Sequence, residues 1–161
     1  MNTIEKKKLF LIGFTAAGIV LLDQILKIIV IKNLQLRQSI PIIQDIFHFT
    51  YTQNTGAGFG VFQGKTSLLI WFSIIVIGII FFLYDKIPKN KCAQLSVAAI
   101  LGGTFGNLID RINLGYVIDY LDFRIWPTFN IADSALTIGI IGLIFYLIKK
   151  DLNKPKTKRK R

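Results

Sequence analysis

The chain has 161 residues, a formal net charge of +11 at pH 7, and 52% hydrophobic residues. Its length argues for a single domain, and its mean hydropathy of +0.52 is too high for an ordinary soluble protein of this size. The single cysteine, Cys92, excludes an intramolecular disulfide and a zinc site built from several cysteines.

Four apolar runs account for the hydrophobic excess, and each is long enough to cross a bilayer. A helix rises about 1.5 Å per residue, so a run of about 20 residues spans a hydrocarbon core of about 30 Å. We therefore predict a mainly α-helical membrane protein with four transmembrane helices. The expected spans are about 9–31, 68–84, 93–110 and 129–148.

The first run follows three consecutive lysines, a pattern that also occurs in cleavable signal peptides. Its length and its internal polar residues favour a retained span instead. Two of these residues, Asp23 and Lys27, lie four positions apart and share one helix face. This spacing predicts an ion pair inside the membrane.

The segment 33–65 is the larger of the two segments that would lie outside the membrane. Residues 46–52 alternate apolar and polar side chains and are rich in aromatic and β-branched types, as in a half-buried strand. Residues 39–43 could pair with them across a turn at residues 44 and 45, which predicts a small β-rich cradle on the outer face. The glycine-rich stretch 54–60 suits a tight loop where backbone approaches a ligand.

Basic residues gather before the first span, between the second and third, and after the fourth. If all four runs span, these clusters share one side of the membrane, and the positive-inside rule makes that side cytoplasmic. Both termini would then be cytoplasmic, and 33–65 and 111–128 would face outward. A single membrane domain at 1–150 would be followed by a basic cytoplasmic tail at 151–161.

The basic tail could instead bind nucleic acid, because runs of Lys and Arg also form phosphate-binding patches. We favour a topology signal that also contacts anionic lipid, since the other two basic clusters lie on the same side of the membrane. No nucleic-acid partner is therefore expected.

Aspartates at the predicted outer boundary are the best candidates for chemistry. Asp119 lies between the third and fourth runs, and Asp133 lies near the start of the fourth. If their carboxyl groups meet, burial and like charge make them share one proton, so that one activates a water and the other acts as an acid. Spacing alone does not show that they meet, and chance placement at a membrane edge is the alternative.

Several neighbouring residues could support such a pair. Asp110 and Arg111 are adjacent, which suggests an ion pair or a substrate clamp, and Asn107 precedes Asp110 by one helical turn on the same face. Asn130 could cap the fourth helix or donate a hydrogen bond into the site. Asp122 is expected to be solvated.

Other catalytic groups are poorly represented. The only histidine, His48, is interpreted as a surface residue of the predicted strand, and a serine–lysine pair would require Ser134 to lie beside Lys27. No cluster of histidines and cysteines is present, so neither a metal nor a cofactor is expected.

Five short blocks of residues, and their order along the chain, resemble bacterial lipoprotein signal peptidase, also called signal peptidase II. The resemblance covers about residues 8–148. The blocks are Leu22-Asp23-Gln24 with Lys27, Asn54-Thr55-Gly56-Ala57, Gly102-Gly103 with Gly106-Asn107 and Asp110-Arg111, Val117-Ile118-Asp119-Tyr120, and Phe129-Asn130 with Ala132-Asp133.

This resemblance implies an intramembrane aspartyl endopeptidase that removes the signal peptide from prolipoproteins, cutting before a cysteine that carries diacylglycerol. It places the catalytic dyad on Asp119 and Asp133 and requires no metal or other cofactor. The positions that it implies for substrate binding or support are Asp23, Lys27, Asn54, Gly56, Asn107, Asp110, Arg111, Asn130 and Ala132.

The resemblance also implies the surroundings of the protein. Its expected partners are lipid-modified prolipoproteins, membrane lipid and the cyclic peptide inhibitor globomycin, and a monomer is expected. The expected location is the bacterial cytoplasmic membrane, as a multi-pass protein with its active site toward the outer face.

Two other functions are considered beside this one. The first is a four-span transporter that uses Asp23 or Asp133 as a proton-coupled cation site, although no inverted repeat is visible and Asp119 lies toward the outer edge. The second is a non-catalytic membrane assembly factor, which would need only the packing glycines.

Overall fold

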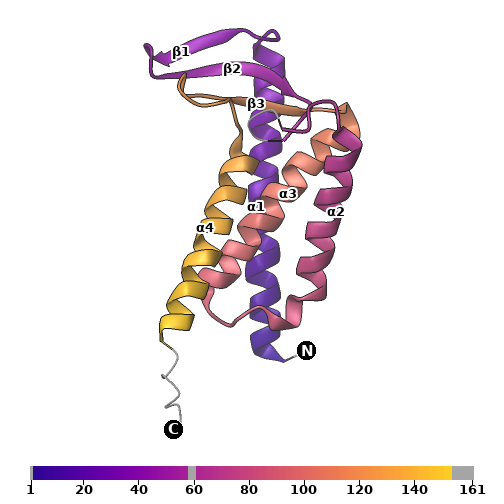
Figure 1. Ribbon diagram of the computed structural model, residues 1–161, viewed down its shortest axis with the longest axis vertical. Helices are drawn as coiled ribbons and strands as arrows, with labels where there is room; N and C mark the ends of the chain where they lie inside the picture. The colour runs from indigo at the N-terminus through magenta and orange to yellow at the C-terminus, as the bar shows by residue number, and fades with distance from the viewer. Residues whose placement is uncertain (1, 58–60, 154–161) are drawn as a thin grey trace, which may run out of the picture.

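The structure is a computed structural model that describes residues 2–57 and 61–153. Within these residues, four α-helices run side by side, and a three-stranded sheet lies across one end of them (Figure 1). The helices are α1 (Thr3–Asn33), α2 (Thr66–Phe82), α3 (Lys91–Leu114) and α4 (Ile131–Leu152), with a 3-10 helix η2 (Tyr84–Lys86) after α2. The strands are β1 (Ser39–Ile43), β2 (Phe47–Asn54) and β3 (Val117–Asp122).

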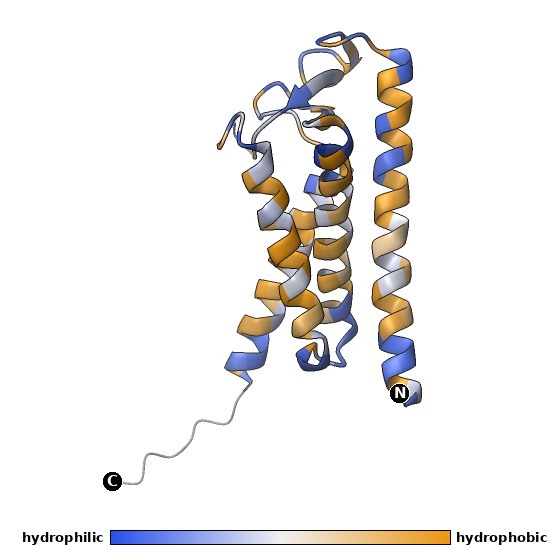
Figure 2. Ribbon diagram, turned by 90° about the vertical axis from the view of Figure 1, so that its right-hand side faces the viewer, coloured by the Kyte–Doolittle hydropathy of each residue, from blue (hydrophilic) through white to orange (hydrophobic). Residues whose placement is uncertain are grey.

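The helices have the dimensions and composition of a membrane bundle. Among the described residues, α1, α3 and α4 are long and apolar enough to cross a membrane, and α2 is a shorter apolar helix of 17 residues. Apolar residues dominate their length, and polar residues gather toward the two ends and in the half of α1 near the sheet (Figure 2). The most apolar window of α3 is 72% buried, against 11% for α1 and α4. Helix α3 is therefore the centre of a multi-pass membrane protein whose other helices expose apolar surface.

The predicted fold class, a mainly helical membrane protein with a small β-rich cradle, is confirmed. The helix ends differ from the predicted spans because caps, rather than hydropathy, decide where a helix begins and ends. Asn130 caps α4, and α3 continues until Gly115, whose φ is 82°. The division into a domain at 1–150 and a tail at 151–161 stays a prediction, and residues 154–161 lie outside the described part.

Small residues let α3 approach its neighbours closely, as predicted for Gly102, Gly103 and Gly106. A Cβ added at Gly103 would overlap the carbonyl oxygen of Ala132 in α4. A Cβ at Gly106 would lie 2.7 Å from Oδ2 of Asp23 in α1. These contacts bring the first turn of α4 and the buried carboxylate of α1 to the same level of α3.

The sheet contains the predicted hairpin and one strand that was not predicted. β1 pairs antiparallel with β2, with Ser39 opposite Thr50, and β2 pairs antiparallel with β3, with Thr52 opposite Asp119. β3 comes from the second outward segment, where Val117 to Leu121 form a β-favouring run interrupted by the aspartate. This third strand holds Asp119 beside β2, over the end of the helical bundle (Figure 1).

Candidate active site

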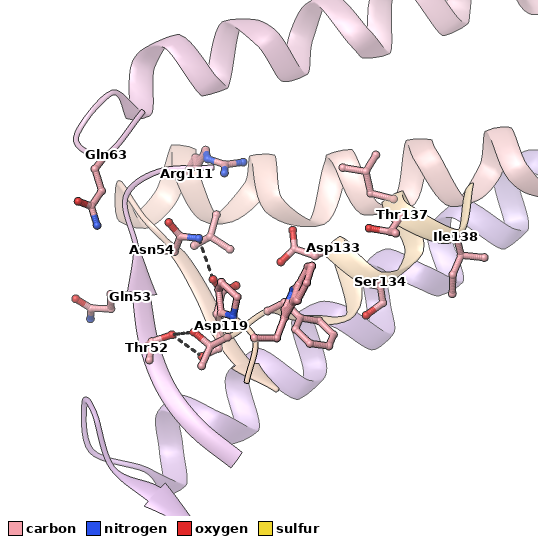
Figure 3. A pocket seen from close by; sticks show the side chains of 16 residues that line it. Thr52, Gln53, Asn54, Gln63, Arg111, Asp119, Asp133, Ser134, Thr137 and Ile138 are labelled. Carbon is pink, nitrogen blue, oxygen red and sulfur yellow. Dashed lines mark hydrogen bonds between the residues drawn. The ribbon is translucent and has the colours of Figure 1, made fainter. Parts of the chain in front are cut away.

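Asp119 and Asp133 come from different elements and line the same cavity. β3 supplies Asp119, and the first turn of α4 supplies Asp133. The cavity has a volume of about 640 Å³ and lies between the sheet and the ends of α3 and α4 (Figure 3). The polar side chains of Asn54 and Arg111 also line it. The fold thus brings together two carboxyl groups whose proximity the sequence spacing left open.

Two side-chain amides hold the carboxyl group of Asp119, which is only 1% exposed. Nδ2 of Asn54 donates to Oδ2 at 3.0 Å, and Nδ2 of Asn130 donates to Oδ1 at 2.7 Å. Burial and the nearby charge of Asp133 raise the pKa of Asp119 to about 7, against the opposing effect of the two amides and of Lys27. Near neutral pH, the carboxyl group of Asp119 can therefore hold a proton.

Asp133 is held by one amide side chain and by the cap of its own helix. Nδ2 of Asn107 donates to Oδ1 of Asp133 at 2.7 Å, and the backbone N of Asn130 donates to Oδ2 at 3.2 Å. In return, Oδ1 of Asn130 accepts from the backbone N of Asp133 at 2.9 Å. Asn130 therefore caps α4 and also donates to Asp119, so it links both carboxyl groups.

Lys27 lies at the centre of a buried ionic cluster. Its Nζ is 2.8 Å from Oδ2 of Asp23, which confirms the predicted pair, and 2.8 Å from Oδ2 of Asp110. Of the two alternatives for Asp110 and Arg111, the ion pair is wrong, because adjacent helical residues point in different directions, and the substrate clamp stays a prediction. Arg111 instead points toward the loop after β2, where its NH2 donates to the carbonyl oxygen of Gly56 at 3.0 Å.

Gly56 and Ala132 contribute through their small size and their backbone. A Cβ at Gly56 would lie 2.7 Å from the carbonyl oxygen of Val61, so the loop after β2 can close only around a glycine. Ala132 is fully buried against α3, and its backbone N donates to Oδ1 of Asp23 at 3.0 Å. Asp23 therefore ties α1 to the first turn of α4, next to Asp133.

The expectation that Asp122 is solvated is wrong. Asp122 is 6% exposed, and its carboxylate accepts hydrogen bonds from Oγ1 of Thr50 at 2.7 Å and from Arg124 at 3.0 Å. Thr50 is distant in sequence, so no local pattern indicates this contact. Asp122 does not line the cavity that contains Asp119, because residues three apart on a strand face opposite sides of the sheet.

The other candidate nucleophile and base take no part in the cavity chemistry. His48 is a half-buried residue of β2 that contacts Oγ of Ser39 at 3.0 Å. Ser134 lines the cavity, but its hydroxyl donates to the carbonyl oxygen of Asn130 at 2.9 Å. The ammonium of Lys27 lies among Asp23, Asp110 and Asn107, so a serine–lysine pair does not form.

Sequence reasoning missed several polar residues that line the cavity. Thr52 and Thr128 share a hydrogen bond of 2.7 Å between their hydroxyls, and Gln53 and Gln63 lie at the rim. Thr52 could have been found, because it lies two residues before Asn54 on the predicted strand and so shares its face. Thr128 and Gln63 belong to loops, where no periodicity applies.

Comparisons with known proteins agree with this architecture. The family described as signal peptidase (SPase) II matches residues 15–149. The lipoprotein signal peptidase of Halothermothrix orenii is 48% identical over 133 residues, which cover 83% of this chain and 92% of that protein. The lipoprotein signal peptidase of Moorella thermoacetica is 43% identical over 128 residues, covering 79% of this chain and 85% of that protein.

Solved structures show the same fold. A bacterial membrane enzyme determined at 2.3 Å resolution superposes with a TM-score of 0.84 at 32% identity, covering 92% of this chain and 94% of the other. A match of this extent to one family of proteases sets aside the transporter and the assembly factor. The chain belongs to the signal peptidase II family of membrane proteases, which process lipoproteins.

Proposed function

We propose that the chain is an aspartic endopeptidase that removes the signal peptide from diacylglyceryl-modified prolipoproteins. It cuts before the lipid-modified cysteine and uses Asp119 and Asp133 as a catalytic dyad. The observation that carries this proposal is that both carboxyl groups line one cavity, where burial and like charge raise the pKa of Asp119 to about 7. A pair that holds one proton near neutral pH can act as an acid and a base together.

The contacts favour Asp119 as the acid and Asp133 as the base. Asp133 sits in the first turn of α4, where a helix favours negative charge, and Arg111 lines the same cavity. Asp133 takes a proton from water while the water oxygen bonds to the scissile carbonyl carbon. Asp119 gives its proton to the carbonyl oxygen at the same time.

The tetrahedral intermediate then breaks down with the protons returned. Asp133 donates its proton to the amide nitrogen as the carbon–nitrogen bond breaks, and Asp119 recovers its proton from the hydroxyl as the carbonyl re-forms. The products are the released signal peptide and a chain that begins with the lipid-modified cysteine. Both aspartates end in their starting protonation states, so no cofactor is required.

The walls around the dyad suit a substrate that is partly peptide and partly hydrocarbon. The cavity under the sheet presents hydroxyl and amide groups from β2 and from the loop before α4. A second cavity, of about 370 Å³, lies on the α2 side and shares Arg111, Asp133 and Leu136 with the first. Its wall from α2 is mainly apolar, with Leu69, Phe72 and Val76. An apolar signal peptide and lipid chains can therefore reach Asp133 from within the bilayer.

The orientation in the membrane follows from charge. The basic residues at the start of α1, between α2 and α3, and at the end of α4 lie at the end of the bundle opposite the sheet (Figures 1 and 2). The positive-inside rule assigns that end to the cytoplasm, and with it both termini. The dyad then faces the outer side of a bacterial cytoplasmic membrane, where a monomer cleaves its substrate and binds globomycin in the same cavity.

The test is cleavage of a diacylglyceryl-modified prolipoprotein by purified protein, compared with Asp119→Asn and Asp133→Asn. Each substitution should lower the rate by about 10³-fold or more, because an acid or base is lost while the shape of the side chain is kept. Asp122→Asn is the matched control, since this aspartate lies on the same strand but outside the cavity, and it should cleave normally. Normal rates in both dyad variants would overturn the proposal.

A further inference from the structure

The buried Lys27 makes three polar contacts that use all three of its N–H groups. Its side chain is 1% exposed, and Nζ contacts Asp23 and Asp110, each at 2.8 Å. The third contact is a hydrogen bond of 3.1 Å to Oδ1 of Asn107. The two carboxylates already exceed the charge of the lysine, so a neutral amide is not needed to compensate that charge. The contact with Asn107 therefore suggests a role beyond charge balance.

Asn107 connects this ionic cluster to the dyad. Its Oδ1 accepts from Lys27 and also, at 3.1 Å, from Nδ2 of Asn130. Its Nδ2 donates to Oδ1 of Asp133 at 2.7 Å. Reversal of the amide would place its NH₂ group against two donors and its oxygen against a carboxylate, and each of these contacts is repulsive. The donors on one side therefore determine that an N–H faces Asp133.

We propose that Lys27 is a positioning residue for catalysis: it holds the carboxamide of Asn107 in the orientation that donates to Asp133. This inference rests on the proposed dyad and assigns to α1 a part in the reaction. An amide N–H at Asp133 favours its ionised form, which accepts the proton of water. The same arrangement keeps Asn130 directed toward Asp119, since both amides meet at Oδ1 of Asn107.

Other charged groups also face the dyad, and they have to be separated from the effect of Lys27. Helix α1 presents Asp23 and Lys27, α3 presents Asp110 and Arg111, and β3 presents Tyr120 beside Asp119. The α2 residues at the neighbouring cavity, Leu69, Phe72, Ser73 and Val76, do not titrate. A variant that removes Lys27 must therefore keep the total charge of the cluster.

The substitution Lys27→Met alone leaves two buried carboxylates without their cation, which strongly destabilises a protein. The double variant Asp23→Asn/Lys27→Met reduces this problem, because it removes one anion together with the cation and leaves Asp110 its hydrogen bonds from Gln24 and from the backbone N of Ile118. The oxygen of asparagine at position 23 can still accept from the backbone N of Ala132, now 3.0 Å from Asp23. Asp23→Asn alone is the matched control, since it retains Lys27 and its hydrogen bond to Asn107.

The experiment measures kcat, KM and the pH dependence of prolipoprotein cleavage, with thermal unfolding as a check on the fold. In the double variant we expect kcat to fall by about 10- to 100-fold with little change in KM, because the reacting groups are misplaced but the cavity is intact. The acid limb of the pH profile should move upward by about one pH unit, because Asp133 loses a donor to its ionised form. In the Asp23→Asn variant, the acid limb of the pH profile should stay at the same pH or move to lower pH.

Each outcome decides the matter. A double variant with the kcat and acid limb of the parent shows that Lys27 only stabilises the fold, and this overturns the inference. If Asp119→Asn and Asp133→Asn are inactive in the same series, the proposed dyad stands despite that result. If those two variants still cleave, the dyad and the role of Lys27 are both overturned.

Discussion

The two halves of the helical bundle bury different kinds of side chain. Near the sheet, the buried residues that contact one another across the helices are Asp23, Lys27, Asn107, Asp110, Asp119 and Asn130. At the opposite end, a buried cluster is formed by Ile12, Ile87, Val97, Ala98 and Leu101. Both clusters join α1 to α3, but only the cluster near the sheet does so with ionic and amide side chains that are costly to remove from water.

This difference shows where the fold serves chemistry rather than stability. An apolar cluster gains from close packing alone, whereas each buried amide or carboxylate needs a partner with correct geometry. Asp119 satisfies both of its oxygens with amide donors, yet its pKa is still raised to about 7, because burial and Asp133 outweigh them. The half near the sheet thus contains Asp119, whose charged form is unfavourable in the folded protein, whereas the apolar cluster contains no such group.

The largest expected effect comes from Asp119→Asn, which should abolish cleavage and also remove a pH-dependent contribution from the stability of the fold. The pKa of Asp119 is raised from about 4 in an unfolded chain to about 7 when folded, so folding favours the protonated form. Its contribution to stability is present below pH 4 and is lost as the pH rises toward 7. Asparagine does not titrate, so the stability of the variant should lack this decrease with rising pH.

Thermal unfolding of the parent and of Asp119→Asn between pH 4 and pH 8 measures this contribution directly. As the pH rises from 4 to 8, the unfolding temperature of the parent should fall relative to that of the variant. Cleavage by the parent should in turn fall above about pH 7, as Asp119 loses the proton that it donates. Parallel unfolding curves for the two proteins would contradict the assigned ionisation.

The next effect concerns Asn130, which combines a cap with a catalytic contact. Serine caps helices about as well as asparagine, but its hydroxyl is too short to replace the amide that donates to Asp119. We expect Asn130→Ser to lower kcat/KM by about 100-fold while the contribution of the helix cap to stability is kept. Asn130→Ala should lose both properties, with an added loss of about 1 kcal/mol in stability. Equal effects of both substitutions on stability would argue against this separation.

A smaller effect is expected from a substitution at Gly103, where α3 packs against the first turn of α4. Gly103→Ala would push its Cβ into the carbonyl of Ala132, which lies next to Asp133, so α4 must shift at its first turn. We expect a loss of about 1–3 kcal/mol in stability and a fall in activity of about tenfold. Gly78→Ala in α2 is the control, because no atom lies within 4 Å of its added Cβ. Comparison of unfolding and cleavage for the two variants tests whether the close approach positions the dyad.

The sequence predicted the bundle more completely than the site. Long apolar runs and small residues such as Gly106 determine the helices and their contacts, and these are local properties that hydropathy and composition report. The Asp23–Lys27 pair could be predicted for the same reason, since both residues lie on one turn of one helix.

What the sequence could not supply were contacts between elements far apart in the chain. Asp110 binds a lysine of α1 instead of its own neighbour Arg111, and Asp122 is buried by a threonine of another strand. β3 was not predicted, because the strand it pairs with, β2, lies far away in the chain. In each case the partner that decides the role lies on a different element, so no spacing along the sequence reveals it.

The smallest expected effect on activity comes from the apolar half. Leu101 is 6% exposed and packs with Ile12 and Ile87 in the apolar cluster. Leu101→Ala should lower stability by about 2 kcal/mol, at the low end of the usual range, because packing rather than transfer from water is lost in a membrane. Its kcat at temperatures well below unfolding should equal that of the parent. A large loss of activity without a change in fold would mean that the two halves are coupled, and that the apolar end also determines the geometry of the dyad.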